Sequence, residues 1–460
     1  MSESLHQSTP AASLASSSKL VFGLIPLATG LLVILATATL DGRDRTSQTW
    51  RGVIFAPEGR PPWEGALTIH VRSVPLHHFP TQQALYNQAR DTIAQADAEA
   101  MGLDMTERII SVDMPSTDFE TLLASGRPPV PGKPELVAGV YTRLDRFELD
   151  GATFEVVGRL QSGIPGLYFA YLLPDDPAWN AIFAKSAGAT TGWLDPDGME
   201  RIADMEDPEA FMKREAVTSR QAPVRTANAY LVTLGLLLIA TGGALVHLAL
   251  FQFCASLGAG VLSPIFNAVA QHRRLVLGMH VFLYGGFFVS MLMSMRLPVV
   301  SIFLQEYIAH EFREGGLSYI GAAYESGDIF RATGATFLNN YLLQTVVLTI
   351  CISFVVPMIG VLKTLASFVL VGFGMAPLWS GMAGMFMFHS ITMTLEFEGY
   401  IFACVAVCVF WIHLLEGLRQ RQFAAGLVAG LKVVGSGTLL SGLMLALAGL
   451  YEATTLILLM

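Results

Sequence analysis

Residues 20–40 read LVFGLIPLATGLLVILATATL, an uninterrupted apolar run that follows Lys19. A helix of about 20 apolar residues crosses the hydrocarbon core of a bilayer, so this run predicts a transmembrane anchor over residues 19–40. The small-residue motif Ala36-Thr37-Ala38 leaves a cleaved signal peptide as the alternative. We favour an uncleaved anchor, because the run is long for a signal sequence.

Similar apolar runs fill the chain after residue 226. The sequence is 53% hydrophobic and only 14% charged, against about 25% charged in an ordinary soluble domain. We therefore expect an α-helical polytopic membrane protein of about seven transmembrane helices, with an inserted α+β extracytoplasmic domain. After the anchor, the expected spans are 229–250, 275–295, 340–362, 365–387, 399–416 and about 426–458.

The polar segment 41–226 is the predicted extracytoplasmic domain, and residues 1–18 are a predicted disordered cytoplasmic tail. The segment carries 18 basic and 27 acidic residues, which accounts for the whole net charge of −9. Such an acidic chain without a basic patch argues against nucleic acid as a partner. Alternating or turn-bounded patterns predict strands at 68–74, 154–160 and 167–173, and helices at 81–102 and 117–126.

Basic residues in the short connections predict the orientation. His272-Arg273-Arg274, Lys363, and Arg419 with Arg421 fall on one side of a seven-span arrangement, which the positive-inside rule makes cytoplasmic. The acidic connection 297–338, the segment 41–226 and the C-terminus then lie outside. Arg43, Arg45 and Arg51 oppose this assignment, but long domains translocate largely regardless of charge.

Residues 122–160 resemble the extracytoplasmic domain of MacB- and FtsX-type ABC permeases. The matching elements follow in the order Gly126-Arg127, Pro131-Gly132-Lys133, Glu135, Gly151 and Phe154-Glu-Val-Val-Gly158. The resemblance implies a MacB-like domain over about 45–222, placed directly after a single anchor.

Residues from about 270 to 460 resemble the stage II sporulation protein M family of integral membrane proteins. The residues that carry the likeness are Asn339-Asn340, Gly360, Gly372-Phe-Gly374, His389, Glu396, Glu398 and Glu452-Ala453. At two positions the chain departs from the family pattern, with Ser390 where a glycine is usual and Met393 where a glutamate is usual. Both resemblances imply a location in the bacterial plasma (inner) membrane.

Together the resemblances favour a permease-like membrane subunit of an ABC-type or envelope-remodelling complex. No GxxxxGK[ST] motif occurs, so a separate ATPase subunit is the expected partner, along with membrane lipid, other envelope proteins and a homo- or hetero-oligomeric assembly. The connection 251–274 would receive the ATPase, through an apolar side that includes Phe251 and Val261 and through His272, Arg273 and Arg274. The alternative is a non-transporting scaffold that organises peptidoglycan-remodelling partners.

Polar residues inside apolar segments are the candidate functional residues, because ionisable groups are costly in a membrane. We expect Asn339 and Asn340 to cap a helix and to pair between helices, and Glu396 and Glu398 to lie at the start of a span. His389 would lie within reach of either carboxylate, and Glu452 must face protein or water. The single histidines His247 and His280 are expected to be packed and hydrogen-bonded and not to be ligands. The sequence predicts no catalytic, metal-binding or cofactor-binding set.

Overall fold

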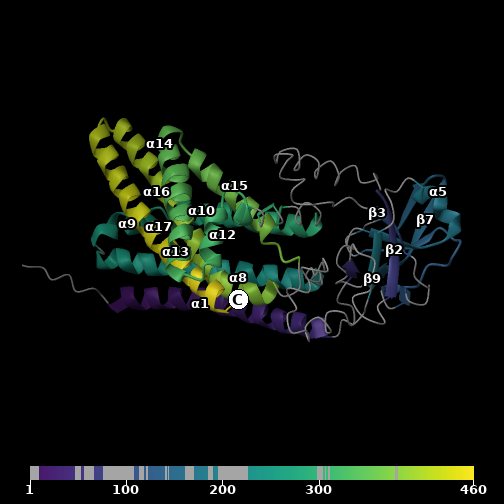
Figure 1. Cartoon of the computed structure of the whole chain (residues 1–460). Helices are drawn as coiled ribbons and strands as arrows, with labels where there is room; N and C mark the ends of the chain where they lie inside the picture. The colour runs from purple at the N-terminus through teal and green to yellow at the C-terminus, as the bar shows by residue number, and fades with distance from the viewer. Residues whose placement is uncertain are drawn as a thin grey trace, which may run out of the picture.

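The computed structural model describes most of the chain. The described residues are 10–46, 53–55, 67–75, 108–112, 119–120, 123–139, 142, 144–160, 170–184, 190–194, 226–258, 260–297, 304–305, 307–308, 311–378 and 382–459. The expected helix 81–102 lies outside them. Long helices dominate, with a small sheet beside them (Figure 1).

The helices fall into a long set and a short set. The long ones are α1 (Pro10–Thr46), α8 (Thr226–Leu257), α10 (Arg273–Arg296), α15 (Ile359–Gly374), α16 (Met382–Arg419) and α17 (Phe423–Leu459). The remaining ones are α5 (Asn180–Phe183), α9 (Ser263–Gln271), α12 (Ser318–Glu325), α13 (Ile329–Phe337), the π-helix η3 (Leu338–Cys351), α14 (Ile352–Val355) and the 3₁₀ turns η1 (Pro177–Trp179) and η2 (Gly260–Leu262).

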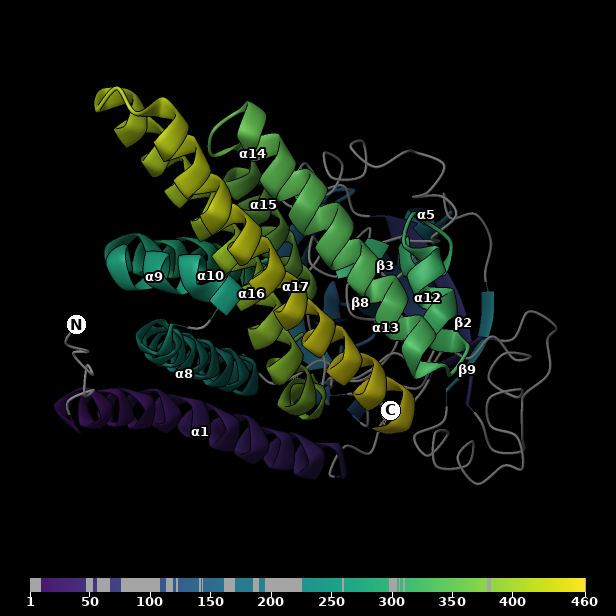
Figure 2. The same ribbon diagram turned by 90° about the vertical axis from the view of Figure 1, so that its left-hand side faces the viewer.

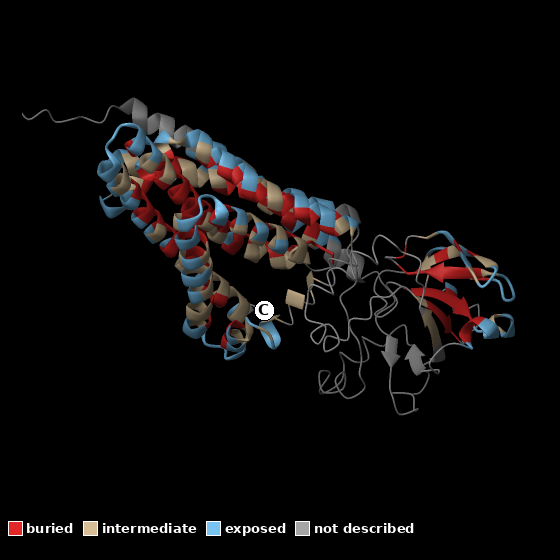
Figure 3. Ribbon diagram, turned by 90° about the horizontal axis from the view of Figure 1, so that it is seen from above, coloured by how far each residue is buried: buried red, intermediate tan, exposed pale blue. Residues whose placement is uncertain are grey.

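Among the described residues, six helical segments are long and apolar enough to cross a membrane. They are Leu20–Leu40, Asn228–Leu257, Arg273–Arg296, Ile329–Val355, Met382–Arg419 and Phe423–Leu458. Their outward faces carry exposed aliphatic side chains such as Leu32, Val281 and Leu447, while the buried residues line the contacts between helices (Figure 3). Apolar surface of this kind suits a lipid environment, so the chain is a multi-pass membrane protein.

The predicted boundaries 340–362, 365–387 and 399–416 are wrong. The first of these helices runs over Ile329–Val355 and ends at Val356, whose extended backbone (φ −127°, ψ 109°) is the conformation that the following Pro357 imposes. Asp328 starts this helix, since its carboxylate accepts hydrogen bonds from the Phe330 and Arg331 amides. The predicted span 365–387 corresponds to α15, whose 16 residues measure about 24 Å and fall short of the length of the six membrane-spanning segments.

Helix α16 is continuous over 38 residues, where the sequence suggested a connection near 388–398. Glu396 and Glu398 therefore lie inside a long helix and not at the start of a span. In the sequence, the polarity of this segment resembled that of a loop. In the structure each of the two carboxylates has a polar partner within the bundle, so the helix continues without a break. Lys363 likewise lies within α15 and not in a connection between spans.

Two antiparallel pairs, α1 with α8 and α16 with α17, form much of the bundle (Figure 2). Glycines allow the first pair to approach closely: a Cβ on Gly30 would lie 2.5 Å from the Gly235 carbonyl oxygen, and one on Gly242 would lie 2.5 Å from the Leu27 nitrogen. Small residues at such crossings are typical of membrane helix packing.

Three connections lie at one end of the bundle. Trp411 of α16 donates a hydrogen bond to the Ser353 carbonyl at 2.9 Å, which places the turn 356–358 beside the last third of α16. The His272 and His413 rings lie 6.4 Å apart, which adds the α9–α10 junction to the same end. Arg273, Arg274, Arg419 and Arg421 therefore gather where α16 turns into α17.

The described strands form one mixed sheet in the order β1-β9-β2-β3-β8-β5-β7-β4, with β6 paired to β7. Parallel pairing joins β3 to β8 and β5 to β7, and the other pairs are antiparallel. The bounds are β1 Val53–Phe55, β2 Leu67–Pro75, β3 Arg108–Val112, β4 Leu123–Gly126, β5 Glu135–Ala138, β6 Arg146–Leu149, β7 Ala152–Leu160, β8 Ala170–Pro174 and β9 Thr190–Leu194.

The predicted strands 68–74 and 154–160 are present as β2 and β7, and the described part of 167–173 lies in β8. The predicted helix 117–126 is wrong in its second half: Phe119 and Glu120 are helical, but Leu123–Gly126 is strand β4, paired antiparallel to β7. Gly126 takes a positive φ of 87° with the β7 backbone close by, so the glycine serves a tight strand end and not a helix C-terminus.

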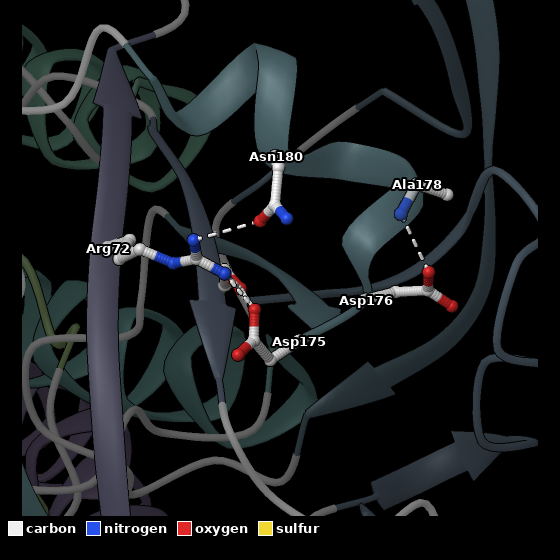
Figure 4. Close-up of polar contacts among 6 residues, drawn as sticks. Arg72, Asp175, Asp176, Ala178 and Asn180 are labelled. Atoms are coloured by element: carbon white, nitrogen blue, oxygen red, sulfur yellow. Dashed lines mark hydrogen bonds and ion pairs between the residues drawn. The ribbon is translucent and has the colours of Figure 1, made fainter.

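Polar side chains tie the sheet to its short helices. Arg72 on β2 forms an ion pair with Asp175 and donates a hydrogen bond to Asn180 at the start of α5 (Figure 4). Asp176 caps η1 by accepting a hydrogen bond from the Ala178 amide at 2.8 Å. These contacts join β2, β8 and α5 over the aromatic core of Phe147, Phe154 and Tyr171.

Candidate functional site

A cavity of about 870 Å³ lies among the helices of the C-terminal half, between α12, α13, η3, α15, α16 and α17. Figure 2 shows α12 and α13 beside the C-terminal half of α17, away from its turn to α16. Most of the cavity's lining is apolar and aromatic, and a few polar groups face into the cavity. The polar and ionisable lining residues are Tyr324, Glu325, Thr336, Asn339, Asn340, Gln344, Lys363, Thr364, Ser367, His389, Glu396, Tyr400 and Glu452.

Asn340 and Glu396 make one polar contact across this cavity. The Asn340 amide donates a hydrogen bond to Glu396 Oε1 at 2.8 Å, and Asn339 in turn donates to Asn340 Oδ1 at 2.8 Å. The helix-capping role expected for the two asparagines is wrong, since both lie inside the continuous helix 329–355. Pairing between helices, which was also expected, is present at Asn340.

Glu452 makes the second polar contact. Its Oε1 lies 3.9 Å from His389 Nδ1, and Tyr324 both contacts the Glu452 carboxylate and hydrogen-bonds with Thr336 Oγ1 at 3.2 Å. His389 thus pairs with Glu452 of α17 and with neither of the carboxylates expected on its own helix. Glu396 and Glu452 face the same cavity and interact electrostatically, so two carboxylates from different helices share one site.

The wall that carries Asn340 is a π-helix. The Thr345 and Thr349 hydroxyls donate to the carbonyls five residues earlier, those of Asn340 and Gln344, at 2.8 Å each. Gln344 also accepts a hydrogen bond from Lys363 of α15. Departures from α-helical geometry of this kind frequently mark functional sites. Here the wider turn presents Asn340 and Gln344 to the cavity together.

Glu398 belongs to a separate, largely buried cluster. It is fully buried, with its Oε2 3.0 Å from His280 Nε2 and 4.0 Å from His247 Nδ1, and it accepts a hydrogen bond from the Tyr284 hydroxyl at 3.3 Å. We name these four residues, Glu398, His280, His247 and Tyr284, the buried quartet. They come from α8, α10 and α16.

The expected coupling residues lie at the end of the bundle that holds the turns. Arg273 and Arg274 are exposed at the start of α10, and His272 is half-buried near His413. The apolar side expected for the connection 251–274 is present in part, because Phe251 is buried and α9 packs Ile265, Phe266 and Val269 into the bundle. Exposed apolar residues near this connection include Leu257 and Val261.

Sequence reasoning missed Tyr324, Gln344 and Lys363 in the cavity and the convergence of His247, His280 and Tyr284 on Glu398. Histidines 33 residues apart on antiparallel helices carry no local signal of meeting. The available clue was Glu398 itself, because burying a carboxylate in an apolar helix costs free energy unless polar partners surround it. Which residues these partners are follows only from the packing of the helices. Among the described residues, no group of three or more histidine, cysteine, aspartate or glutamate side chains is arranged to hold a metal ion.

Comparison with known proteins finds no matching family model, no similar curated protein and no similar solved structure.

Proposed function

We propose that the protein is a permease-like membrane subunit and that the cavity beside α17 binds its cargo. The observation that carries this proposal is the presence of two carboxylates, Glu396 and Glu452, in an apolar cavity between apolar helices. Ionisable groups inside membrane segments commonly mark substrate or ion pathways, because burying them destabilises the protein and they are therefore rare without a functional role.

The lining favours an amphipathic cargo with a cationic head group. Phe368, Phe397 and Tyr400 give the cavity aromatic faces, which attract cations, and the carboxylates supply counter-charge. The apolar part of such a molecule would lie against residues such as Leu370, Val371 and Leu456. A volume of about 870 Å³ is within the range of cavities that hold small molecules, about 300–1,000 Å³.

The remainder of the complex is proposed from the sequence. A separate ATPase would dock at the end where Arg273 and Arg274 are exposed, and the sheet domain would contact an envelope partner. Since α9 is packed into the bundle, the ATPase contact would depend on these arginines and on the exposed Leu257 and Val261, not on an inserted amphipathic helix.

A binding measurement tests the cargo site. The purified full chain in mild detergent is titrated with dansylcadaverine, a fluorescent amphipathic amine, and fluorescence anisotropy is recorded. The variant E396Q/E452Q should bind at least 10-fold more weakly, whereas E416Q, which removes an exposed carboxylate near the end of α16, should bind as the wild type does. Equal binding by all three proteins would contradict the proposal.

The scaffold alternative is tested with the same protein. Pull-down in mild detergent followed by mass spectrometry should recover an ATP-binding-cassette protein with the wild type, and R273E/R274E should lose it while remaining correctly inserted. Recovery of peptidoglycan-remodelling proteins alone, together with no amine binding, would favour the scaffold.

A further inference from the structure

The buried quartet lies apart from the cargo cavity, in the packing between α8, α10 and α16. Glu398 is fully buried, and the side chains of His280 and His247 are 5% and 15% exposed. The rings of Phe402 and Phe397 pack against His280 and Tyr284 and close the cluster on that side. The proposed binding of cargo in the cavity uses none of the four residues of the buried quartet.

The hydrogen bonds of His280 fix where its protons are. His280 Nδ1 lies 2.7 Å from the Val276 carbonyl oxygen, which only accepts, so Nδ1 carries a hydrogen. In a neutral imidazole the other nitrogen, Nε2, then has a lone pair, and it faces Glu398 Oε2 at 3.0 Å. Two lone pairs repel at this distance. One additional proton must therefore bridge the pair, either on Glu398 or on His280.

Among the residues that the structure describes, no other charged group faces Glu398 and makes this proton unnecessary. From α8 the titratable group facing Glu398 is His247, from α10 they are His280 and Tyr284, and Glu398 itself comes from α16. Lys363 of α15 faces Gln344 at the cavity instead. With the bridging proton the quartet is electrically neutral, which is the form favoured in a dry, low-dielectric interior.

His247 gives the proton a way in and out. Its Nδ1 lies 4.0 Å from Glu398 Oε2 and is buried without a hydrogen bond of normal geometry to a described residue, although the His247 ring also interacts with the Gly243 backbone. Closing that gap by about 1 Å would make a normal hydrogen bond. Of the two histidines, His247 is the more exposed. It lies in the half of α8 that leads to the connection 258–272, at the end of the bundle with the exposed arginines.

We propose that Glu398 and His280 form a proton-binding site in the bundle, which exchanges its proton through His247. In release, the Glu398 O–H bond breaks as an N–H bond forms at His247 Nδ1, and His247 gives up its Nε2 proton to water. Uptake runs in reverse. This goes beyond the proposed function, since proton binding does not depend on any cargo. If transport occurs, the site would couple it to a proton gradient.

The deprotonated site should be a different structure. With the bridging proton gone, Glu398 and His280 repel, and α10 must shift against α16 or His280 must leave Val276. The substitution E398Q removes this event but keeps the contact, because the glutamine amide donates a hydrogen bond to His280 Nε2 as the protonated acid does. E398Q therefore holds the protonated arrangement at every pH.

Hydrogen–deuterium exchange of the purified chain, corrected for the intrinsic effect of pH, tests this. Amides over 276–284 of α10 should exchange faster in the wild type as pH rises, E398Q should show no such change, and the control E416Q, at an exposed position of the same helix, should respond as the wild type does. Infrared difference spectra across the same titration should lose the signal of one carboxyl group in E398Q. An identical pH response in wild type and E398Q would overturn the proposal.

A second variant guards against misfolding and identifies the route. H247Q leaves the Glu398–His280 pair intact, so the equilibrium response should remain while its rate after a pH jump falls at least 10-fold; H413Q is the matched histidine control. An unchanged rate in H247Q would overturn His247 as the route. Stoichiometric Zn²⁺ binding by the wild type that E398Q loses would show a metal site in place of a proton site.

Discussion

Glu396 and Glu398 stand two residues apart on α16 but point into different sites. Glu396 accepts a hydrogen bond from Asn340 at the cavity, and Glu398 is enclosed between His280 and Tyr284. Residues i and i+2 of an α-helix lie about 200° apart around its axis, so one short motif serves two faces. Helix α16 thereby connects the cavity to the buried quartet, and a shift of α16 at one site would reach the other.

The contact between Asn340 and Glu396 should be measurable as a pairwise energy. We expect N340A to lower the free energy of unfolding by about 1–3 kcal/mol, because it leaves the Glu396 carboxylate without its donor inside the cavity. In E396Q the same substitution should cost less. A double-mutant cycle of denaturant titrations in detergent measures the coupling. N267A, at an exposed position of α9, is the control, and additive effects of N340A and E396Q would show that the contact contributes nothing.

The crossing of α1 and α8 should be intolerant of a single methyl group. In G30A the new Cβ would lie 2.5 Å from the Gly235 carbonyl oxygen and 2.9 Å from the Ile239 nitrogen, so the helices must separate. Overpacking of this kind costs about 1–3 kcal/mol. G278A, where the structure leaves open space, is the matched control. Thermal denaturation followed by size-exclusion chromatography should show a lower midpoint for G30A alone.

The sequence was informative where one local property decides the structure. Apolar runs located the membrane-spanning segments of α1, α10 and α17 to within a few residues and that of α8 except for its last turns, and alternation located β2 and β7. It failed where tertiary partners decide. His389, Glu396 and Glu398 resembled a connection because their polarity is visible and their partners on α17, η3 and α10 are not. The break at Pro357, in contrast, was available from the backbone rule for the residue before proline.

The ion pair between Arg127 and Glu135 should make the sheet domain sensitive to acid. Arg127 donates two hydrogen bonds to Glu135, at 2.7 and 2.8 Å, and these lower the pKa of Glu135 to about 2, assisted by the Val130 amide and opposed by burial. A carboxylate whose pKa is lowered in the folded state adds stability above its ordinary pKa of about 4.5. That stability is lost as pH falls from about 4.5 to about 2.

The variant E135Q should remove this pH dependence and lower stability at neutral pH. The measurement is circular dichroism of the sheet domain expressed as residues 45–222, which we expect to fold alone because it contains no cysteine and has its own core. E148Q, at an exposed position of β6, serves as control. A domain that is disordered in isolation would show that the membrane helices complete its core, and an equal acid response in E135Q would remove Arg127–Glu135 as its cause.

The orientation in the membrane follows from the end at which the turns gather. The α9–α10 junction and the α16–α17 turn lie at one end with Arg273, Arg274, Arg419 and Arg421, so the positive-inside rule predicts that this end is cytoplasmic. A reporter that is active only outside the cytoplasm should be silent when fused at Gln271 or Gln420 and active when fused after residue 226. Because Gln271 and Gln420 belong to helices far apart in sequence, their agreement tests the packing as well as the orientation. Reporter activity at both positions, with no activity after residue 226, would show that the protein has the opposite orientation in the membrane. Activity at only one would mean that the two turns lie on opposite sides of the membrane, and the arrangement of α10 against α16 that builds both polar sites would then be wrong.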